Sequence, residues 1–130
     1  EDYGDRGDAA ILGVYEGAVE EFEHGYLTPQ ECSNHTEMRW LEVCGEDKPT
    51  LQIKYVGKPF EASVNEYSIE QLENTTHRHL LQKTGRLTVT FDGKQRGVGG
   101  DVPAFACTKP RYKIYPVVKH SFSVQLSFKK

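Results

Sequence analysis

The chain has 130 residues, of which 37% are hydrophobic and 11% aromatic, and its formal net charge is −3. This length suits one domain with a single core, predicted over residues 1–130, and the aromatic content argues against intrinsic disorder. Acidic and basic residues are interspersed, and no apolar run reaches 18 residues, so we expect neither nucleic acid nor a membrane as a partner.

Residues 1–35 are predicted to form a long ordered loop. The stretch EEFEHGYLTPQECSNH shows no sustained hydrophobic period and is rich in turn-forming residues, while AILGVYEGAV before it is compatible with an irregular strand. Loops of this length in a compact domain usually carry function or are held by a partner.

From residue 36 onward, apolar side chains recur at every second position, which is the period of a β-strand. The predicted strands lie in EMRWLEV (37–43), LQIKY (51–55), FEASV (60–64), RLTVTF (86–91) and SFSVQLSF (121–128). In the last of these, apolar residues such as Val124 and Leu126 alternate with Ser or Gln, so one face covers a core and the other meets water. The sequence therefore predicts an all-β, mainly antiparallel fold.

One helix is predicted near residues 68–82. Ser68 followed by Gln71 has the spacing of a capping box, and apolar residues then recur at intervals of three and four as far as Leu80. This stripe can lie on a sheet, and Gly85 is a plausible stop signal.

The cysteines and histidines do not predict a metal site. Cys32, Cys44 and Cys107 are an odd number without a C-x-x-C pair, so we expect thiols, with one disulfide as the alternative. On a helix, His77 and His79 would point about 200° apart and could not share one ion, and His79 would face the core.

A glycine-rich segment, RGVGGDVPAF (96–105), follows an Asp-Gly pair that is typical of a hairpin turn. The segment matches neither the phosphate-binding loop nor the dinucleotide fingerprint. In addition, Asp101 would repel a phosphate and Pro103 disfavours the helix that those motifs require. We interpret the glycines as a bulged strand or a tight corner where the backbone passes close to another segment.

Four stretches together resemble a known family. Their order and approximate spacing are those of the last domain of bacterial β-galactosidases of glycoside hydrolase family 2, and they read EDYGDR, LTPQECSNHTEMRWLEV, YSIEQLENTTHRHLL and FDGKQRGVGGD. The chain resembles the C-terminal half of this small-chain domain over essentially its whole length. On that pattern it starts partway through the domain.

The resemblance implies a galactose-mutarotase-like supersandwich that belongs to a soluble bacterial enzyme, cytoplasmic or periplasmic, acting on β-galactosides. In this family, an upstream TIM-barrel domain carries the two catalytic glutamates and binds magnesium and sodium. We therefore expect no catalytic residue, metal or other cofactor in this chain, and we expect its partner to be the remainder of the parent enzyme.

The resemblance also implies a sugar-facing loop, because one loop of the family's last domain enters the active site and carries a Trp just after Gly-Gly-Asp. The substrate-binding residues implied here are Gly99, Gly100, Asp101, Ala104 and Phe105. Ala104 stands at the position of that Trp, so either Phe105 provides the stacking surface or the substrate differs.

A second departure from the family lies in PQECSN, where Cys32 and Ser33 stand at positions that are mostly Asn and Gly in relatives. A turn with positive φ is less comfortable for these residues, so the loop geometry there is an open question.

The alternative function is a stand-alone carbohydrate-binding or protein-interaction β-sandwich module. Exposed and coplanar rings of Trp40, Tyr55 and Tyr112 would support it, and a buried Trp40 would oppose it. Half of a two-sheet domain leaves an apolar face open, so we also expect homo-oligomers through exposed sheet surface, or a helix that covers that side.

Overall fold

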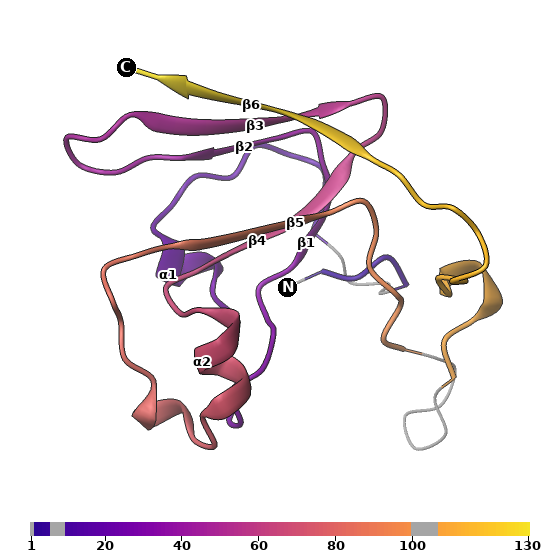
Figure 1. Cartoon of the computed structure of the whole chain (residues 1–130), viewed down its shortest axis with the longest axis horizontal. Coiled ribbons are helices and arrows are strands. Elements are labelled where there is room, and N and C mark those ends of the chain that lie inside the picture. Colours follow the sequence, from indigo (N-terminus) through magenta and orange to yellow (C-terminus); the bar gives the residue numbers. More distant parts are fainter. Residues whose placement is uncertain (1, 6–9, 100–106) are drawn as a thin grey trace.

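Two antiparallel sheets form the body of the protein in a computed structural model that describes residues 2–5, 10–99 and 107–130. Its elements in chain order are α1 (Val19–Phe22), β1 (His35–Met38), β2 (Trp40–Val43), β3 (Thr50–Val56), β4 (Phe60–Asn65), α2 (Ile69–Asn74), η1 (Arg78–Leu80), β5 (Thr88–Asp92), η3 (Pro110–Tyr112) and β6 (Ser123–Lys129). One sheet has the strand order β1-β4-β5 and the other β2-β3-β6 (Figure 1). The predicted all-β, mainly antiparallel fold is confirmed.

The core lies between the two sheets. Ile53 on β3 and Phe60 and Ala62 on β4 are at most 1% exposed and pack together. The partly buried residues around them come from the other strands as well as from β3 and are Met38, Leu41, Leu51, Val89, Phe91 and Val124. Because each buried aliphatic or aromatic side chain contributes about 1.5–3 kcal/mol, this contact is what holds the sheets face to face.

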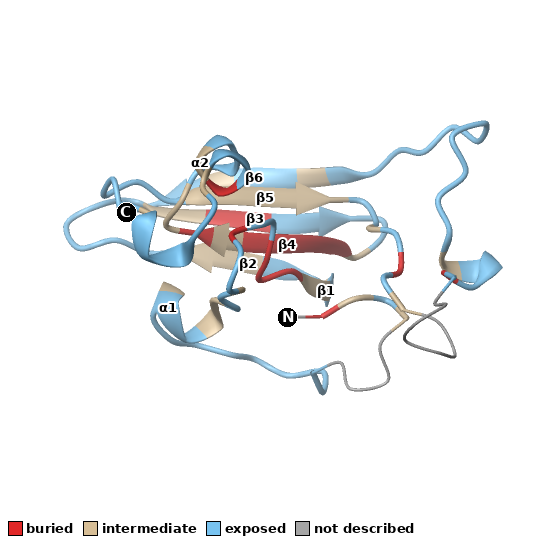
Figure 2. Ribbon diagram, turned by 90° about the horizontal axis from the view of Figure 1, so that it is seen from below, coloured by how far each residue is buried: buried red, intermediate tan, exposed pale blue. Residues whose placement is uncertain are grey.

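Strand β4 is buried on both faces, as Figure 2 shows in red. Its alternate residues Glu61, Ser63 and Asn65 point away from the core, yet each is no more than 8% exposed. The N-terminal loop covers them, since the Cys32 thiol lies 3.4 Å from Asn65 Oδ1 and Asn34 Nδ2 donates to Glu61 at 3.0 Å. The loop predicted for residues 1–35 is thus pinned to the sheet where it is described, with the four-residue helix α1 inside it.

The prediction of one strand over residues 37–43 is wrong. The chain forms β1 and β2 there, and these belong to different sheets. Glu37 has a φ of 56°, and the β1–β4 register shifts between His35 and Met38, so the backbone turns out of one sheet and enters the other. The apolar positions change phase here, from Met38 and Trp40 to Leu41 and Val43, which is the one trace that the turn leaves in EMRWLEV.

The predicted helix at 68–82 is correct at its start but too long. Ser68 Oγ accepts from Gln71 N at 3.1 Å, yet α2 ends at Asn74 and Thr75 is extended. The Asn74 side chain donates to Glu70 O, a local bond of the kind that competes with helix continuation. A short 3-10 turn follows at η1.

Two expectations for the helix face therefore change. Leu72 is the buried residue of α2, while Ile69 and Leu80 are 48% and 53% exposed, so no long stripe lies on a sheet. His79 is exposed rather than buried, and its ring contacts that of His77 edge to face at 5.5 Å. The two rings can meet because these residues do not lie on one continuous α-helix.

The predicted Asp-Gly hairpin after Phe91 is also not formed. Gly93 does not adopt a positive φ, and no strand pairs back onto β5 among the residues that follow it in the described part of the chain. A Cβ at Gly93 would lie 2.7 Å from the Phe122 ring. This glycine is therefore required by a close packing contact and not by a turn.

Candidate functional site

Two described stretches, residues 96–99 and 107–112, flank the segment that carries the predicted sugar-facing residues and together form a stem. Gly99 is half-buried, while Gly100, Asp101, Ala104 and Phe105 lie outside the described residues, so their role stays a prediction. In Figure 1 the stem, residues 96–99 and 107–112, lies at the opposite end of the molecule from α2.

Hydrogen bonds tie the two sides of the stem together. Gly97 N donates to Tyr112 O at 3.0 Å, and Gly97 O accepts from the Thr108 hydroxyl at 2.8 Å. Arg96 Nε donates to the same hydroxyl at 3.2 Å, and Thr108 is only 4% exposed. Residues 96 and 97 are therefore held beside residues 108–112 by these bonds.

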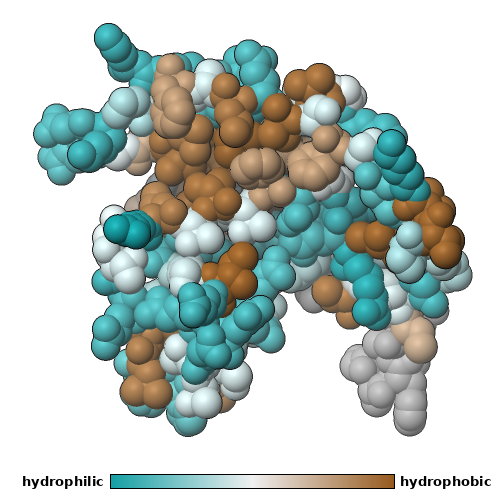
Figure 3. All heavy atoms as spheres, viewed as in Figure 1, coloured by the Kyte–Doolittle hydropathy of each residue, from teal (hydrophilic) through white to brown (hydrophobic). Residues whose placement is uncertain are grey.

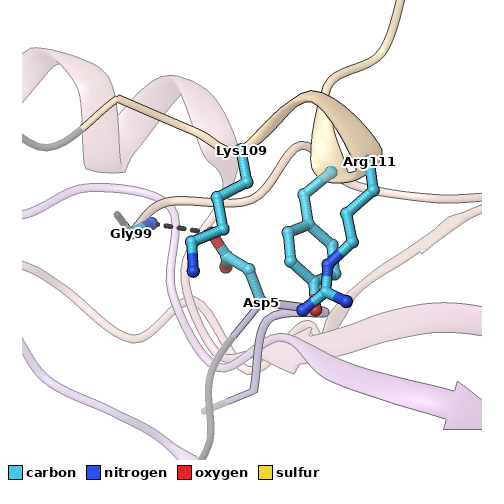
Figure 4. A pocket seen from close by; sticks show the side chains of 5 residues that line it. Asp5, Gly99, Lys109 and Arg111 are labelled. Atoms are coloured by element: carbon cyan, nitrogen blue, oxygen red, sulfur yellow. Dashed lines mark hydrogen bonds between the residues drawn. The ribbon is translucent and has the colours of Figure 1, made fainter. Parts of the chain in front are cut away.

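A pocket of about 80 Å³ opens beside this stem, lined by Asp5, Gly99, Lys109, Arg111 and Tyr112. Figure 4 shows Asp5 facing Gly99, whose N–H donates to the carboxylate at 2.9 Å. Lys109 and Arg111 enter from the segment around η3, and the guanidinium carbon of Arg111 lies 4.5 Å from the centre of the Tyr112 ring. The pocket thus combines cationic donors, a carboxylate and an aromatic side chain, which suits the binding of a polar ligand group.

The pocket is small, at about 80 Å³. Among the described residues, no three His, Cys, Asp or Glu side chains are arranged to hold a metal ion. Cys32, Cys44 and Cys107 are thiols that form no disulfide, as the residue pattern predicts.

A second polar cluster lies on the outer face of β4. Asn34 is 1% exposed and donates from Nδ2 to Asp2 O at 2.9 Å and to Glu61 Oε2 at 3.0 Å. Asp2 N donates to Asn34 O at 2.6 Å. Burial raises the pKa of Glu61, against the opposing effect of the hydrogen bond from Asn34. This cluster fastens the N-terminal residues to the sheet but forms no open site.

Ser33 shows how the departure in PQECSN is accommodated. It has a φ of 66° and is fully buried, so a residue with a side chain does occupy a left-handed position there. Its hydroxyl accepts from His24 N at 3.0 Å and donates to the Cys32 sulfur at 3.5 Å. These bonds offset part of the strain, which is about 1–3 kcal/mol for such a residue.

Asp5, Thr108, Lys109 and Arg111 were not predicted as site residues. The available signal was EDYGDR, the stretch that holds Asp5, together with FDGKQRGVGGD. These two stretches meet in the structure through Asp5 and Gly99, although about 90 residues separate them. No local pattern reports such a contact.

Comparisons with known proteins agree with the resemblance. The family model described as β-galactosidase small chain matches residues 1–126. A β-galactosidase of Priestia megaterium is 38% identical over 116 residues, which is 88% of this chain and 11% of that protein. A β-galactosidase small subunit of Latilactobacillus sakei is 30% identical over 138 residues, covering 98% of this chain and 43% of the relative. The chain therefore spans about a tenth of the length of the first relatives.

Proposed function

Since this chain belongs to the β-galactosidase small-chain family, we propose that it is the C-terminal, non-catalytic portion of an enzyme that hydrolyses terminal β-galactosides. In this role it packs on the catalytic TIM-barrel domain and directs the loop Gly99 to Phe105 toward the sugar. The observation that supports the proposal most is the stem, because Gly97, Thr108 and Tyr112 tie together the two sides from which this loop leaves.

The pocket beside the stem is consistent with a supporting rather than a catalytic role. Glycoside hydrolysis needs two carboxyl groups about 5–9.5 Å apart across the scissile bond. Among the described residues that line this pocket, Asp5 is the one carboxylate, and it is already engaged by two backbone amides. We propose that the catalytic glutamates, magnesium and sodium belong to the barrel domain and that this chain carries no cofactor of its own.

An apolar surface on β6 supports the proposal of a large partner. Leu126 and Phe128 are 54% and 73% exposed, and Phe122 before the strand is 44% exposed. Figure 3 shows apolar side chains gathered over β6 and the adjoining gap between the sheets. Exposed apolar surface of this kind marks an interaction site, and we propose that the remainder of the parent enzyme covers it as part of a supersandwich.

The same surface leads us to propose that the isolated chain forms homo-oligomers. The expected result is a concentration-dependent dimer or larger species in sedimentation, weakened by Phe128→Ser. Val117→Ser, at an even more exposed apolar residue away from the sheets, is the control. A strictly monomeric wild-type chain at high concentration would contradict the proposal.

No helix in the described part of the chain has the length and apolarity to cross a membrane.

The rival function, a stand-alone carbohydrate-binding module, gains less support. Trp40 is 44% exposed and Tyr55 is 42% exposed. However, Trp40 pairs with Lys54, and the neighbouring residue Tyr55 points to the opposite face of the sheet. The two rings therefore do not form one coplanar platform.

The function is tested in the full-length enzyme with Phe105→Ala. Removing a stacked ring is expected to raise KM about tenfold with little change in kcat, because the lost contact contributes about 1–2 kcal/mol to substrate binding. Leu27→Ala, at a residue 91% exposed, should leave both constants unchanged. An unchanged KM for Phe105→Ala, or hydrolysis of a chromogenic β-galactoside by the 130-residue chain alone, would overturn the proposal.

A further inference from the structure

We propose that Asp5 is a positioning residue of this site, whose carboxylate fixes the stem from which the sugar-facing loop leaves. The role of the loop rests on the proposed function, whereas the contact itself does not. The Asp5 carboxylate accepts from Val98 N at 3.1 Å through Oδ1 and from Gly99 N at 2.9 Å through Oδ2.

One carboxylate that accepts from two successive amides selects a particular backbone shape. In an extended strand, successive N–H groups point to opposite sides, so Val98 and Gly99 could not both face Asp5. The shared acceptor therefore favours a bent backbone at the position where the loop begins. Hydrogen bonds to an ionised group are roughly twice as strong as neutral ones, which makes a carboxylate better suited to this task than an amide.

Gly97 makes the close approach of Asp5 possible. A Cβ on residue 97 would lie 2.4 Å from Asp5 Oδ2 and 2.9 Å from the Tyr112 Cβ. Gly97 is also bonded to the other side of the stem, through Tyr112 O and the Thr108 hydroxyl. Residues 97–99 are thus held between Asp5 on one side and residues 108–112 on the other.

This arrangement ties three distant parts of the sequence together at the base of the loop. A loop that leaves a preformed base loses less conformational freedom when it contacts a ligand, so its binding residues gain affinity. Asp5 also lines the pocket with Lys109 and Arg111, whose positive charges attract its carboxylate.

The contact is tested first in the 130-residue chain by amide NMR. In Asp5→Asn and Asp5→Ala, the proton resonances of Val98 and Gly99 are expected to move upfield, because a charged acceptor is lost. Asp47→Asn, in the turn between β2 and β3, removes the same charge at a distance and should leave both resonances in place. Unchanged Val98 and Gly99 resonances in the Asp5 variants would overturn the proposal.

Gly97→Ala provides a second and independent variant. Because its Cβ would displace the Asp5 carboxylate, it is expected to give the same resonance changes, and the double variant should add little to either single change. Gly4→Ala is the matched control, since a Cβ at Gly4 meets nothing within 4 Å. Fully additive effects in the double variant would mean that Asp5 and Gly97 act separately. That result would count against the proposal that Asp5 fixes the stem.

The functional arm uses the full-length enzyme and separates KM from kcat. Asp5→Asn is expected to raise KM about fivefold and to change kcat by less than about twofold, as for a residue that positions a binding group. Unchanged KM in Asp5→Asn, where Phe105→Ala raises KM, overturns the positioning role. Unchanged KM in both variants overturns the proposed function instead, while the NMR result still decides whether the contact exists.

Discussion

Asp2 and Asp5 both fasten the start of the chain to a distant segment, but their surroundings differ. Asp2 is 8% exposed; its backbone N–H donates to Asn34 O and its backbone C=O accepts from the Asn34 side chain. Asp5 is half-buried, binds two backbone amides of the stem and lines an open pocket. The comparison indicates that the two contacts have different roles. The buried contact of Asp2 stabilises the fold, and the open contact of Asp5 shapes a site.

The largest test of this difference removes the buried contact. Asn34→Ala is expected to lower the free energy of unfolding by about 3 kcal/mol, because it leaves buried partners on Asp2 and Glu61 without their hydrogen bonds. Urea denaturation measures the change. Asn74→Ala, which removes an exposed amide bonded to Glu70 O, should have a much smaller effect. If both variants lost the same free energy of unfolding, the buried contact would not be the more stabilising one.

A second test uses pH on the same cluster. Burial raises the pKa of Glu61 above its ordinary value of 4.5, so the folded state binds more protons than the unfolded state. Its contribution to stability is therefore fully present below about pH 4.5 and is lost as pH rises through the raised pKa.

Glu61→Gln removes this ionisation. The variant is expected to melt a few degrees above the wild type at pH 7, with the two melting temperatures converging toward pH 4. Thermal unfolding followed by circular dichroism between pH 4 and pH 8 measures this difference. Glu37→Gln, at an exposed residue, should show no such trend. If the melting temperature of Glu61→Gln, relative to that of the wild type, were lower at pH 7 than at pH 4, the expected direction of the effect would be wrong.

The smallest effect on stability is expected at the open contact. Asp5→Ala should lower the free energy of unfolding by less than about 1 kcal/mol, because its partners Val98 and Gly99 lie at a solvent-facing pocket where water can replace the carboxylate. Denaturation with urea tests this, side by side with Asn34→Ala. A loss as large as that of Asn34→Ala would assign Asp5 to the fold rather than to the site.

The alternation of apolar and polar residues predicted most strands, because it can be read from consecutive positions in the sequence. The segment 121–128 contains most of β6 (Ser123–Lys129), although Leu126 and Phe128 on its apolar face are exposed and do not cover the core as predicted, and Ser68 capped α2 as its spacing indicates. The same reasoning overextended the helix, since a stripe of apolar residues does not register the local bond that Asn74 makes to Glu70 O. It also joined β1 and β2, because a change of phase between Trp40 and Leu41 does not by itself report that the backbone turns at Glu37, where φ is positive.

The site was predictable only in part. The glycines around Gly99 indicated a close approach of backbone to another segment, and Gly97 does have such a neighbour in Asp5. The identity of that neighbour depends on chain topology, which no spacing within the sequence reveals. At Ser33 the resemblance raised the question of a positive φ, because relatives mostly carry glycine there, and the structure answers it with a φ of 66° and a hydroxyl that accepts from His24 N.

The pairing of β3 with β6 has a consequence for the order of folding. Seven residue pairs join these strands, from Thr50 with Lys129 to Val56 with Ser123, and every pair is separated by more than 60 residues. During synthesis at about 5–20 residues per second, β2 and β3 would wait several seconds as a two-stranded ribbon before β6 left the ribosome. Such a ribbon is at best marginally stable, so β3 is the strand that most needs protection from wrong pairing while the protein is being made.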